Sequence, residues 1–265
     1  MPSTVWKGSV SFGLVSFPVG LSAAARPDTV HFHLLHKKDN SRLKEVWYCA
    51  EEDKPVESNE IVKGYEYNKG HYAVVDPAEL KKVTPPTASV MEILQFVKTD
   101  EVDPIFFEKS WYVIPQPQGE KPYRLLRQAM EETGYRAIAK LTMHGREHIV
   151  IIRPSDDGLV LHTLYFVNEL NKSNKTKPAG SGAFTKKEVE LAKRLIDALA
   201  GPFKPEQYKD EYRQNVEKLI EQKRKGQKIT AVAQPKAAPV VDIMEALQRS
   251  LAKKPAARKK AKRAA

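Results

Sequence analysis

The sequence predicts a mainly β protein with a helical C-terminal region and a basic tail. Up to about residue 170, short segments in which apolar and polar residues alternate are separated by turn-forming residues. After that point the apolar spacing becomes helical, and the chain then becomes rich in lysine. Many short strands with few helices between them are typical of a β-barrel or a β-sandwich.

Residues 6–21 are the first alternating segment. Val10 and Phe12 share one face, and after Leu14 the apolar positions move to the other parity. This change beside Gly13 predicts a strand with a β-bulge or a sharp bend. A secretory signal would need an unbroken apolar stretch, but glycine, serine and proline interrupt this one. We therefore expect the segment to remain in a cytoplasmic protein.

Further segments are rich in β-branched and aromatic residues and are expected to form strands. They cover residues 30–36, 70–76, 91–97, 110–114, 135–143, 147–154 and 159–167. The last three are spaced as successive hairpins, with turn signals at residues 144–145 and 156–158. One helix is expected before them, with Pro122 near its start and Gly134 at its end.

The last third of the chain carries signals for separate helices. Thr185 and Glu188 form a capping-box pattern for a helix that ends at residues 201–202. A second helix is expected from Pro205 to Gly226. The chain is thus divided into a β core (1–182), a helical arm (183–226), a linker (227–239), a short amphipathic helix (240–252) and a basic disordered tail (253–265).

The charge of the chain is distributed unevenly. The formal net charge is +11, yet residues 1–170 hold 20 basic and 23 acidic residues, whereas residues 171–265 hold 24 and 10. Such an asymmetry predicts a polyanionic partner, either nucleic acid or an anionic membrane surface. The tail has seven cations in its 13 residues, which favours nucleic acid. A tail that only keeps the protein soluble is the alternative.

The sequence contains few features of an enzyme. It lacks the phosphate-binding, dinucleotide-binding, nucleophile-elbow and zinc-protease motifs. His31, His33 and His36 resemble a metal cluster, but no carboxylate or cysteine has a helpful spacing, so packed or hydrogen-bonded histidines are favoured and no metal or cofactor is expected. Cys49 is the single cysteine, which excludes an internal disulfide and agrees with a reducing compartment. No apolar run reaches the roughly 18 residues of a membrane helix.

Clusters of cations are the candidate DNA contacts, since side chains of this kind bind the phosphate backbone without reading bases. They lie in the loop 37–44, in the helix 120–134, in the polar stretch after residue 170 and in the tail. The candidates are Lys37, Lys38, Arg42, Lys44, Arg124, Arg127, Lys172, Lys175, Lys177, Lys253, Lys254, Arg258, Lys259, Lys260, Lys262 and Arg263.

The short helix expected at 240–252 has an isolated apolar stripe. Its flanks have the composition of linkers, so docking of this stripe into a groove of a partner protein is favoured over packing on its own chain. The stripe consists of Val241, Ile243, Met244, Leu247 and Leu251.

Several stretches resemble a known family in order along nearly the whole chain. They are WKGSVSFGLVSFPV, FHLLHKKDNSRLK, KGYEY, DPIFFEKSWY, YRLLRQAMEETGYRAIAKL, VLHTLYF, FKPEQYKDEYRQNVEKLIEQK and VVDIMEALQRSL, followed by the basic tail. In these stretches the chain resembles bacterial Ku, the DNA-end-binding proteins of non-homologous end joining.

The resemblance implies a Ku-type β-barrel core with DNA-encircling and dimerisation elements. It implies a ring-shaped homodimer, without catalytic activity, that threads onto the ends of double-stranded DNA, protects and bridges them, and recruits an ATP-dependent DNA ligase. The segment 240–252 would recruit the ligase, and the tail would add DNA contacts. Many relatives carry a C-x-x-C pair, but here Glu52 stands where the second cysteine would follow Cys49. A paired-thiol role is therefore in doubt.

Two alternatives from other classes remain open. One is a nucleoid-associated architectural protein that coats DNA without preferring ends. The other is a lyase that acts at abasic sites through a lysine Schiff base.

Overall fold

The computed structural model describes residues 3–83, 85–171 and 184–228. The chain divides into two compact units. The first unit contains the described strands and the helices α1 (Pro77–Lys82) and α2 (Glu120–Thr133). The second contains α3 (Lys186–Leu199) and α4 (Glu211–Arg224).

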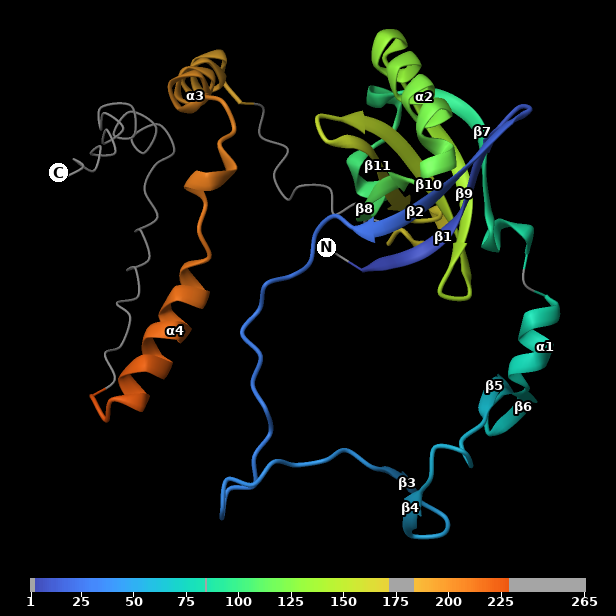
Figure 1. The fold of residues 1–265 in the computed structure, drawn as a ribbon. Coiled ribbons are helices and arrows are strands. Elements are labelled where there is room, and N and C mark those ends of the chain that lie inside the picture. Colours follow the sequence, from blue (N-terminus) through green and yellow to red (C-terminus); the bar gives the residue numbers. More distant parts are fainter. Residues whose placement is uncertain (1–2, 84, 172–183, 229–265) are drawn as a thin grey trace. The chain divides into compact units, whose positions relative to one another are not determined.

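A closed barrel of seven strands forms the centre of the first unit (Figure 1). The strands are β1 (Thr4–Phe12), β2 (Val15–Ala23), β7 (Val90–Lys98), β8 (Phe107–Pro115), β9 (Tyr135–Met143), β10 (Arg146–Ser155) and β11 (Gly158–Leu164). Their order is β1-β2-β8-β11-β10-β9-β7, and β7 closes the barrel by pairing in parallel with β1. The predicted fold class, a mainly β protein with a barrel core and C-terminal helices, is confirmed.

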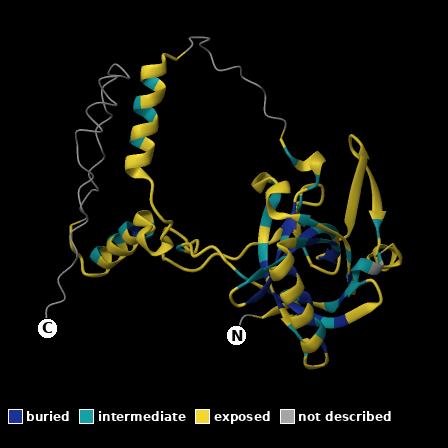
Figure 2. Cartoon of the chain, turned by 90° about the horizontal axis from the view of Figure 1, so that it is seen from above, coloured by how far each residue is buried: buried dark blue, intermediate teal, exposed yellow. Residues whose placement is uncertain are grey.

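Alternation along the strands fills the barrel. In β9, Ala137, Ala139 and Leu141 point into the core, and in β10 Val150 and Ile152 do the same. The small alanines leave room for larger side chains from the other strands. Figure 2 shows that most of the buried residues gather in the barrel. The expected hairpins of the last three strands are confirmed, since β10 pairs with both β9 and β11 in antiparallel register.

Helix α2 adds its apolar face to the same core. Tyr123, Leu126 and Met130 are buried, and the helix packs against β2, β9 and β10. It ends at Gly134, whose φ of 73° is the left-handed conformation that glycine adopts most easily. The predicted helix and its glycine stop are confirmed.

The first alternating segment is a hairpin of two strands rather than one bent strand. Phe12 pairs with Val15, and Gly13 has a φ of 56°, so the chain reverses in a two-residue turn. The reversal explains the change of parity, because β1 and β2 both direct apolar residues inward. The prediction of one strand with a bulge or bend at this point was wrong, because the chain forms two paired strands here.

The connection between β2 and β7 carries small elements that do not join the barrel sheet. It contains the ribbon of β3 (Trp47–Cys49) and β4 (Lys54–Val56), the ribbon of β5 (Lys63–Asn68) and β6 (His71–Val75), and then α1. The strand expected at 70–76 is confirmed as β6. The strand expected at 30–36 is wrong, because these residues are largely exposed and form only one isolated bridge, between Leu35 and Arg42.

In the second unit, both helices begin at polar caps. Thr185 Oγ1 accepts from the Glu188 amide at 3.2 Å, and the Glu188 carboxylate accepts from the Thr185 amide at 2.7 Å, which confirms the capping box. The helix expected from Pro205 begins only at Glu211. Asp210 caps it by accepting from the Arg213 amide at 2.9 Å, and residues 205–207 form a single 3₁₀ turn before it.

The predicted linker, short helix and tail begin at residue 227, and residues 229–265 lie outside the described part of the chain, as do residues 172–183. Among the helices of the described ranges, none is both long enough and apolar enough to cross a membrane.

Candidate nucleic-acid interface

The basic loop 36–44 is a hydrogen-bonded turn in the connection between β2 and β7. The His36 amide donates to the Ser41 carbonyl oxygen, and the Asn40 amide donates to that of His36, both at 2.8 Å. Asn40 completes the turn with a φ of 57°, a conformation that asparagine tolerates better than most residues. The turn holds Lys37 and Lys38 at an exposed tip.

Polar contacts inside this loop hold its other charged groups. Asp39 accepts from the Ser41 amide at 2.9 Å, and this bond is the largest of the causes that lower the pKa of the Asp39 carboxyl. Arg42 Nη2 lies 3.0 Å from His33 Nδ1, and a guanidinium only donates, so Nδ1 is the acceptor of this hydrogen bond. Residues 36–44 contain four cations and a single carboxylate, so the loop is basic as a whole.

The two arginines of α2 differ in their contacts. Arg127 Nε donates to Glu131 Oε1 at 2.8 Å, and its Nη2 lies 3.5 Å from the Asp156 carbonyl oxygen. Arg124, one turn earlier, is exposed. Arg127 is thus partly neutralised within the barrel unit, and Arg124 is the stronger candidate for a phosphate contact.

The remaining predicted site residues lie outside the described part of the chain. They are Lys172, Lys175 and Lys177, the tail cations from Lys253 to Arg263, and the apolar stripe from Val241 to Leu251. Their roles stay predictions.

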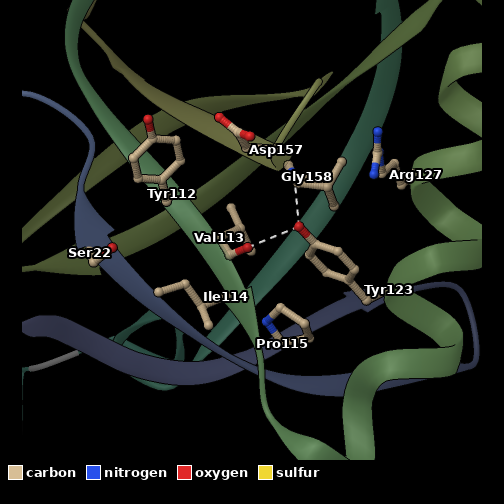
Figure 3. A pocket seen from close by; sticks show the side chains of 10 residues that line it. Ser22, Tyr112, Val113, Ile114, Pro115, Tyr123, Arg127, Asp157 and Gly158 are labelled. Carbon is tan, nitrogen blue, oxygen red and sulfur yellow. Dashed lines mark hydrogen bonds between the residues drawn. The ribbon is translucent and has the colours of Figure 1, made fainter. Parts of the chain in front are cut away.

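A pocket of about 570 Å³ opens beside α2 (Figure 3). The Tyr123 hydroxyl donates to the Val113 carbonyl oxygen at 3.0 Å and accepts from the Leu159 amide at 2.6 Å. Burial raises the pKa of Tyr123, against the smaller effects of the Leu159 amide and Arg127. Both hydrogen bonds involve the backbone, so the phenol ties α2 to β8 and β11 and is not a free acid–base group.

A polar row that the sequence analysis did not identify lies on the outer face of the barrel. Ser110 Oγ is 2.9 Å from His162 Nδ1, and Arg153 Nε donates to His162 Nε2 at 2.9 Å. Because the guanidinium can only donate, Nε2 accepts, and the ring proton resides on Nδ1 and points toward Ser110. Burial first, and then the charge of Arg153, lower the pKa of His162, which agrees with a neutral ring.

This row is not a nucleophilic triad. An activated serine needs an imidazole nitrogen that can take its proton, with an acidic group behind the ring. Here the nitrogen facing Ser110 already carries the proton, and a cation lies behind the ring. The parity of the segments 147–154 and 159–167 could have placed Arg153 and His162 on one face, but nothing local in the sequence indicates that Ser110 lies beside them.

Cys49 is a free, partly exposed thiol at the end of β3. Glu52, three residues after Cys49, pairs with Lys54 Nζ at 2.7 Å. His36 Nδ1 lies 3.1 Å from Asp39 Oδ1, so this histidine too has a partner within its loop. Within the described ranges, no group of three or more His, Cys, Asp or Glu side chains is placed to hold a metal ion.

The barrel defines the class of this protein. Residues 11–191 match the family model described as the Ku70/Ku80 beta-barrel domain. The chain belongs to the Ku family. It is 60% identical to the non-homologous end joining protein Ku of Solibacter usitatus, over 98% of this chain and 100% of that one.

Other relatives bear the same name. The protein of Koribacter versatilis is 48% identical over 95% of this chain and 87% of its own length. The protein of Archaeoglobus fulgidus is 38% identical over 93% of this chain and 97% of its own length. The similarity therefore extends well beyond the barrel.

Proposed function

We propose that this protein binds the ends of double-stranded DNA without reading sequence and acts in non-homologous end joining. The observation that carries the proposal is the 60% identity, over nearly the full length of both chains, to a relative named for that process. The protein would act by binding rather than by catalysis. The Ser110–His162–Arg153 row supports this view. The histidine nitrogen that faces Ser110 already carries a proton, so the ring does not activate the serine.

A ring threaded by DNA would reconcile the charge distribution with this function. The residues up to 170 are slightly acidic as a whole, so they exert little long-range attraction on a polyanion. A closed ring needs only a modest lining of cations, because its topology prevents dissociation once an end has entered. Lys37, Lys38, Arg42, Lys44 and Arg124 are candidates for that lining, and the basic tail would add contacts outside it.

The ring would be a homodimer. Exposed apolar side chains on the second unit support this, because a large apolar surface on a single chain usually marks an interface. Ile196 and Leu199 on α3 are 65% and 68% exposed, and the stacked pair Phe203 and Tyr208 is more exposed still. Sedimentation of the full chain should therefore give the mass of two chains, and Ile196→Asp with Leu199→Asp should lower it toward one.

A ligase would be the downstream partner. The amphipathic stripe at 240–252 has the spacing of a helix that enters a groove on another protein. It is followed directly by the basic tail, so the recruited ligase would be held close to DNA. The protein would work in the cytoplasm, at the nucleoid.

Binding to open and blocked ends tests the proposal. A linear duplex is compared with the same duplex closed at both ends by hairpins, at one fixed moderate salt concentration. We expect tight binding to the open duplex alone, since a ring must be threaded. Equal affinity for both would overturn the proposal and would favour an architectural protein that grips the backbone anywhere.

A further inference from the structure

Two arginines lie on neighbouring strands of the barrel, just beyond the end of the ladder that joins them. The last residue pair in the register of β9 and β10 is Ala137 with Ile152, and Arg136 and Arg153 are the next residues after it on the two strands. Ala137 and Ile152 point into the core, so the adjacent arginines point outward.

This arginine pair (Arg136 and Arg153) has no acidic partner in the described part of the chain. Arg136 Nη1 donates to the Tyr135 carbonyl oxygen at 3.0 Å, and its buried Nε makes no hydrogen bond. Arg153 donates to His162 and, at 3.3 Å, to the Pro154 carbonyl oxygen. Within the same described ranges, no carboxylate lies within 4.0 Å of either guanidinium.

Three other cations on the barrel strands and on α2 have carboxylate partners. Lys140 Nζ lies 3.5 Å from Glu147, Arg127 Nε lies 2.8 Å from Glu131, and Arg146 pairs with Glu169. Like charges close together on neighbouring strands repel each other and destabilise a sheet. An uncompensated pair is therefore a place where an anion from outside would be bound favourably.

The surroundings favour a phosphate over a protein surface. Ile151 and Val160 also point outward beside the pair, yet they are only 2% and 5% exposed. These two side chains therefore leave little apolar surface for a protein partner. Their neighbours Arg153, His162 and Ser110 are charged or polar, which is typical of interfaces with nucleic acid rather than with protein.

We propose that Arg136 and Arg153 form a binding site for backbone phosphates of duplex DNA on the outer face of β9 and β10. His162 and Ser110 are positioning residues of this site: the neutral ring fixes Arg153 Nε, and because Nη1 donates to the Pro154 carbonyl oxygen, Nη2 of the guanidinium is left to the phosphate. The inference rests on the proposed function and adds to it a site on the barrel wall, distinct from the loop 36–44 and from the tail.

The test compares the full-length protein with Arg136→Ala/Arg153→Ala on an open duplex over a range of salt concentrations. Two lost phosphate contacts should make the slope of log affinity against log salt shallower by about 1.8, with affinity lower by about tenfold or more at low salt. Arg136→Lys/Arg153→Lys keeps both charges and should restore most of the slope. The control Arg146→Ala/Arg194→Ala removes the same charge from two arginines that carboxylates already neutralise, and should change the slope little.

An unchanged slope and affinity in a variant that keeps its circular dichroism spectrum and melting temperature would overturn the inference. So would a loss of the dimer mass on sedimentation, since the pair would then bind a carboxylate of another chain. The result is separable from the proposed function. If the wild type binds blocked and open duplexes equally, end binding fails, and the slope difference between wild type and variant still reports whether these arginines contact phosphates.

Discussion

Arg153 donates its Nε hydrogen to His162 Nε2 over 2.9 Å, and this single bond fixes the tautomer of the histidine. With Nε2 occupied as an acceptor, the ring proton lies on Nδ1, 2.9 Å from Ser110 Oγ. The Phe107 ring lies edge-on, with its centroid 5.2 Å from that of the imidazole. A histidine on a barrel surface is thereby held neutral, between a cation, a hydroxyl and an aromatic ring.

The first prediction concerns stability against pH. Burial and Arg153 lower the pKa of His162 in the folded state, so below about pH 6.5 the unfolded chain takes up a proton that the folded protein resists. The free energy of unfolding should therefore reach its highest value above that pH, as far as His162 contributes, and decline as the pH falls below it. Urea unfolding between pH 5 and 8 measures it. His162→Gln keeps an acceptor for Arg153 but does not titrate, and its profile should be flatter; equal profiles would contradict the prediction.

The second prediction concerns the tie between α2 and the barrel. Tyr123→Phe leaves the buried amide of Leu159 and the carbonyl of Val113 without this partner. We expect a loss of about 1–3 kcal/mol in the free energy of unfolding, measured with denaturant. Tyr112→Phe removes the same hydroxyl from a ring that is 37% exposed and should cost much less. Similar losses in both variants would show that the two hydrogen bonds of the Tyr123 hydroxyl do not stabilise the fold as predicted.

The third prediction concerns the basic loop. Reversing the charges of Lys37, Lys38, Arg42 and Lys44 should weaken binding to open DNA ends, because the exposed tip would then repel phosphates. Lys186→Glu/Lys187→Glu is a control in the first turn of α3, where acids favour the helix dipole. Equilibrium binding at two salt concentrations measures the change. If affinity stays at the wild-type value, these residues are not part of the interface.

The fourth prediction concerns the tail. Deleting residues 253–265 removes seven cations. Binding should weaken, and each lost phosphate contact should make the salt slope shallower by about 0.9. A titration of the same duplex over a range of salt concentrations measures the slope. A slope identical to that of the full chain would mean that the tail only aids solubility.

The fifth prediction separates partner binding from DNA binding. Leu247→Asp places a charge in the middle of the apolar stripe at 240–252, which would prevent it from entering an apolar groove. Stimulation of the ATP-dependent ligase should be abolished, while the affinity for DNA ends stays unchanged. Ligation of a linear duplex with and without the protein measures the effect. Full stimulation by the variant would place recruitment elsewhere in the chain.

Local signals were sufficient where the neighbours in space are also neighbours in sequence. The capping box at Thr185 and the glycine stop at Gly134 depend on atoms within one turn, and both are present as predicted. The helix start expected at Pro205 was wrong, and the cause is again local. Asp210 accepts from the Arg213 amide, and this cap starts the helix later than the proline predicted.

Strand prediction failed where pairing decided the outcome. Residues 30–36 have a partly alternating pattern, but a strand exists only when another strand pairs with it, and here a single bridge to Arg42 is all that forms. In the segment 6–21 the alternation correctly predicted β structure. Only the pairing of Phe12 with Val15 shows that the segment contains two strands.

The sequence by itself determined the β class, most of the barrel strands, the capped helices and the concentration of positive charge in the last third of the chain, because alternation, capping and composition are local properties. Only the tertiary structure decided that Arg136 and Arg153 lie at the same end of the β9–β10 ladder and that Ser110 meets His162. Those contacts depend on the register between strands far apart in the chain. Closure of the barrel sets that register, because every strand must match two neighbours at once.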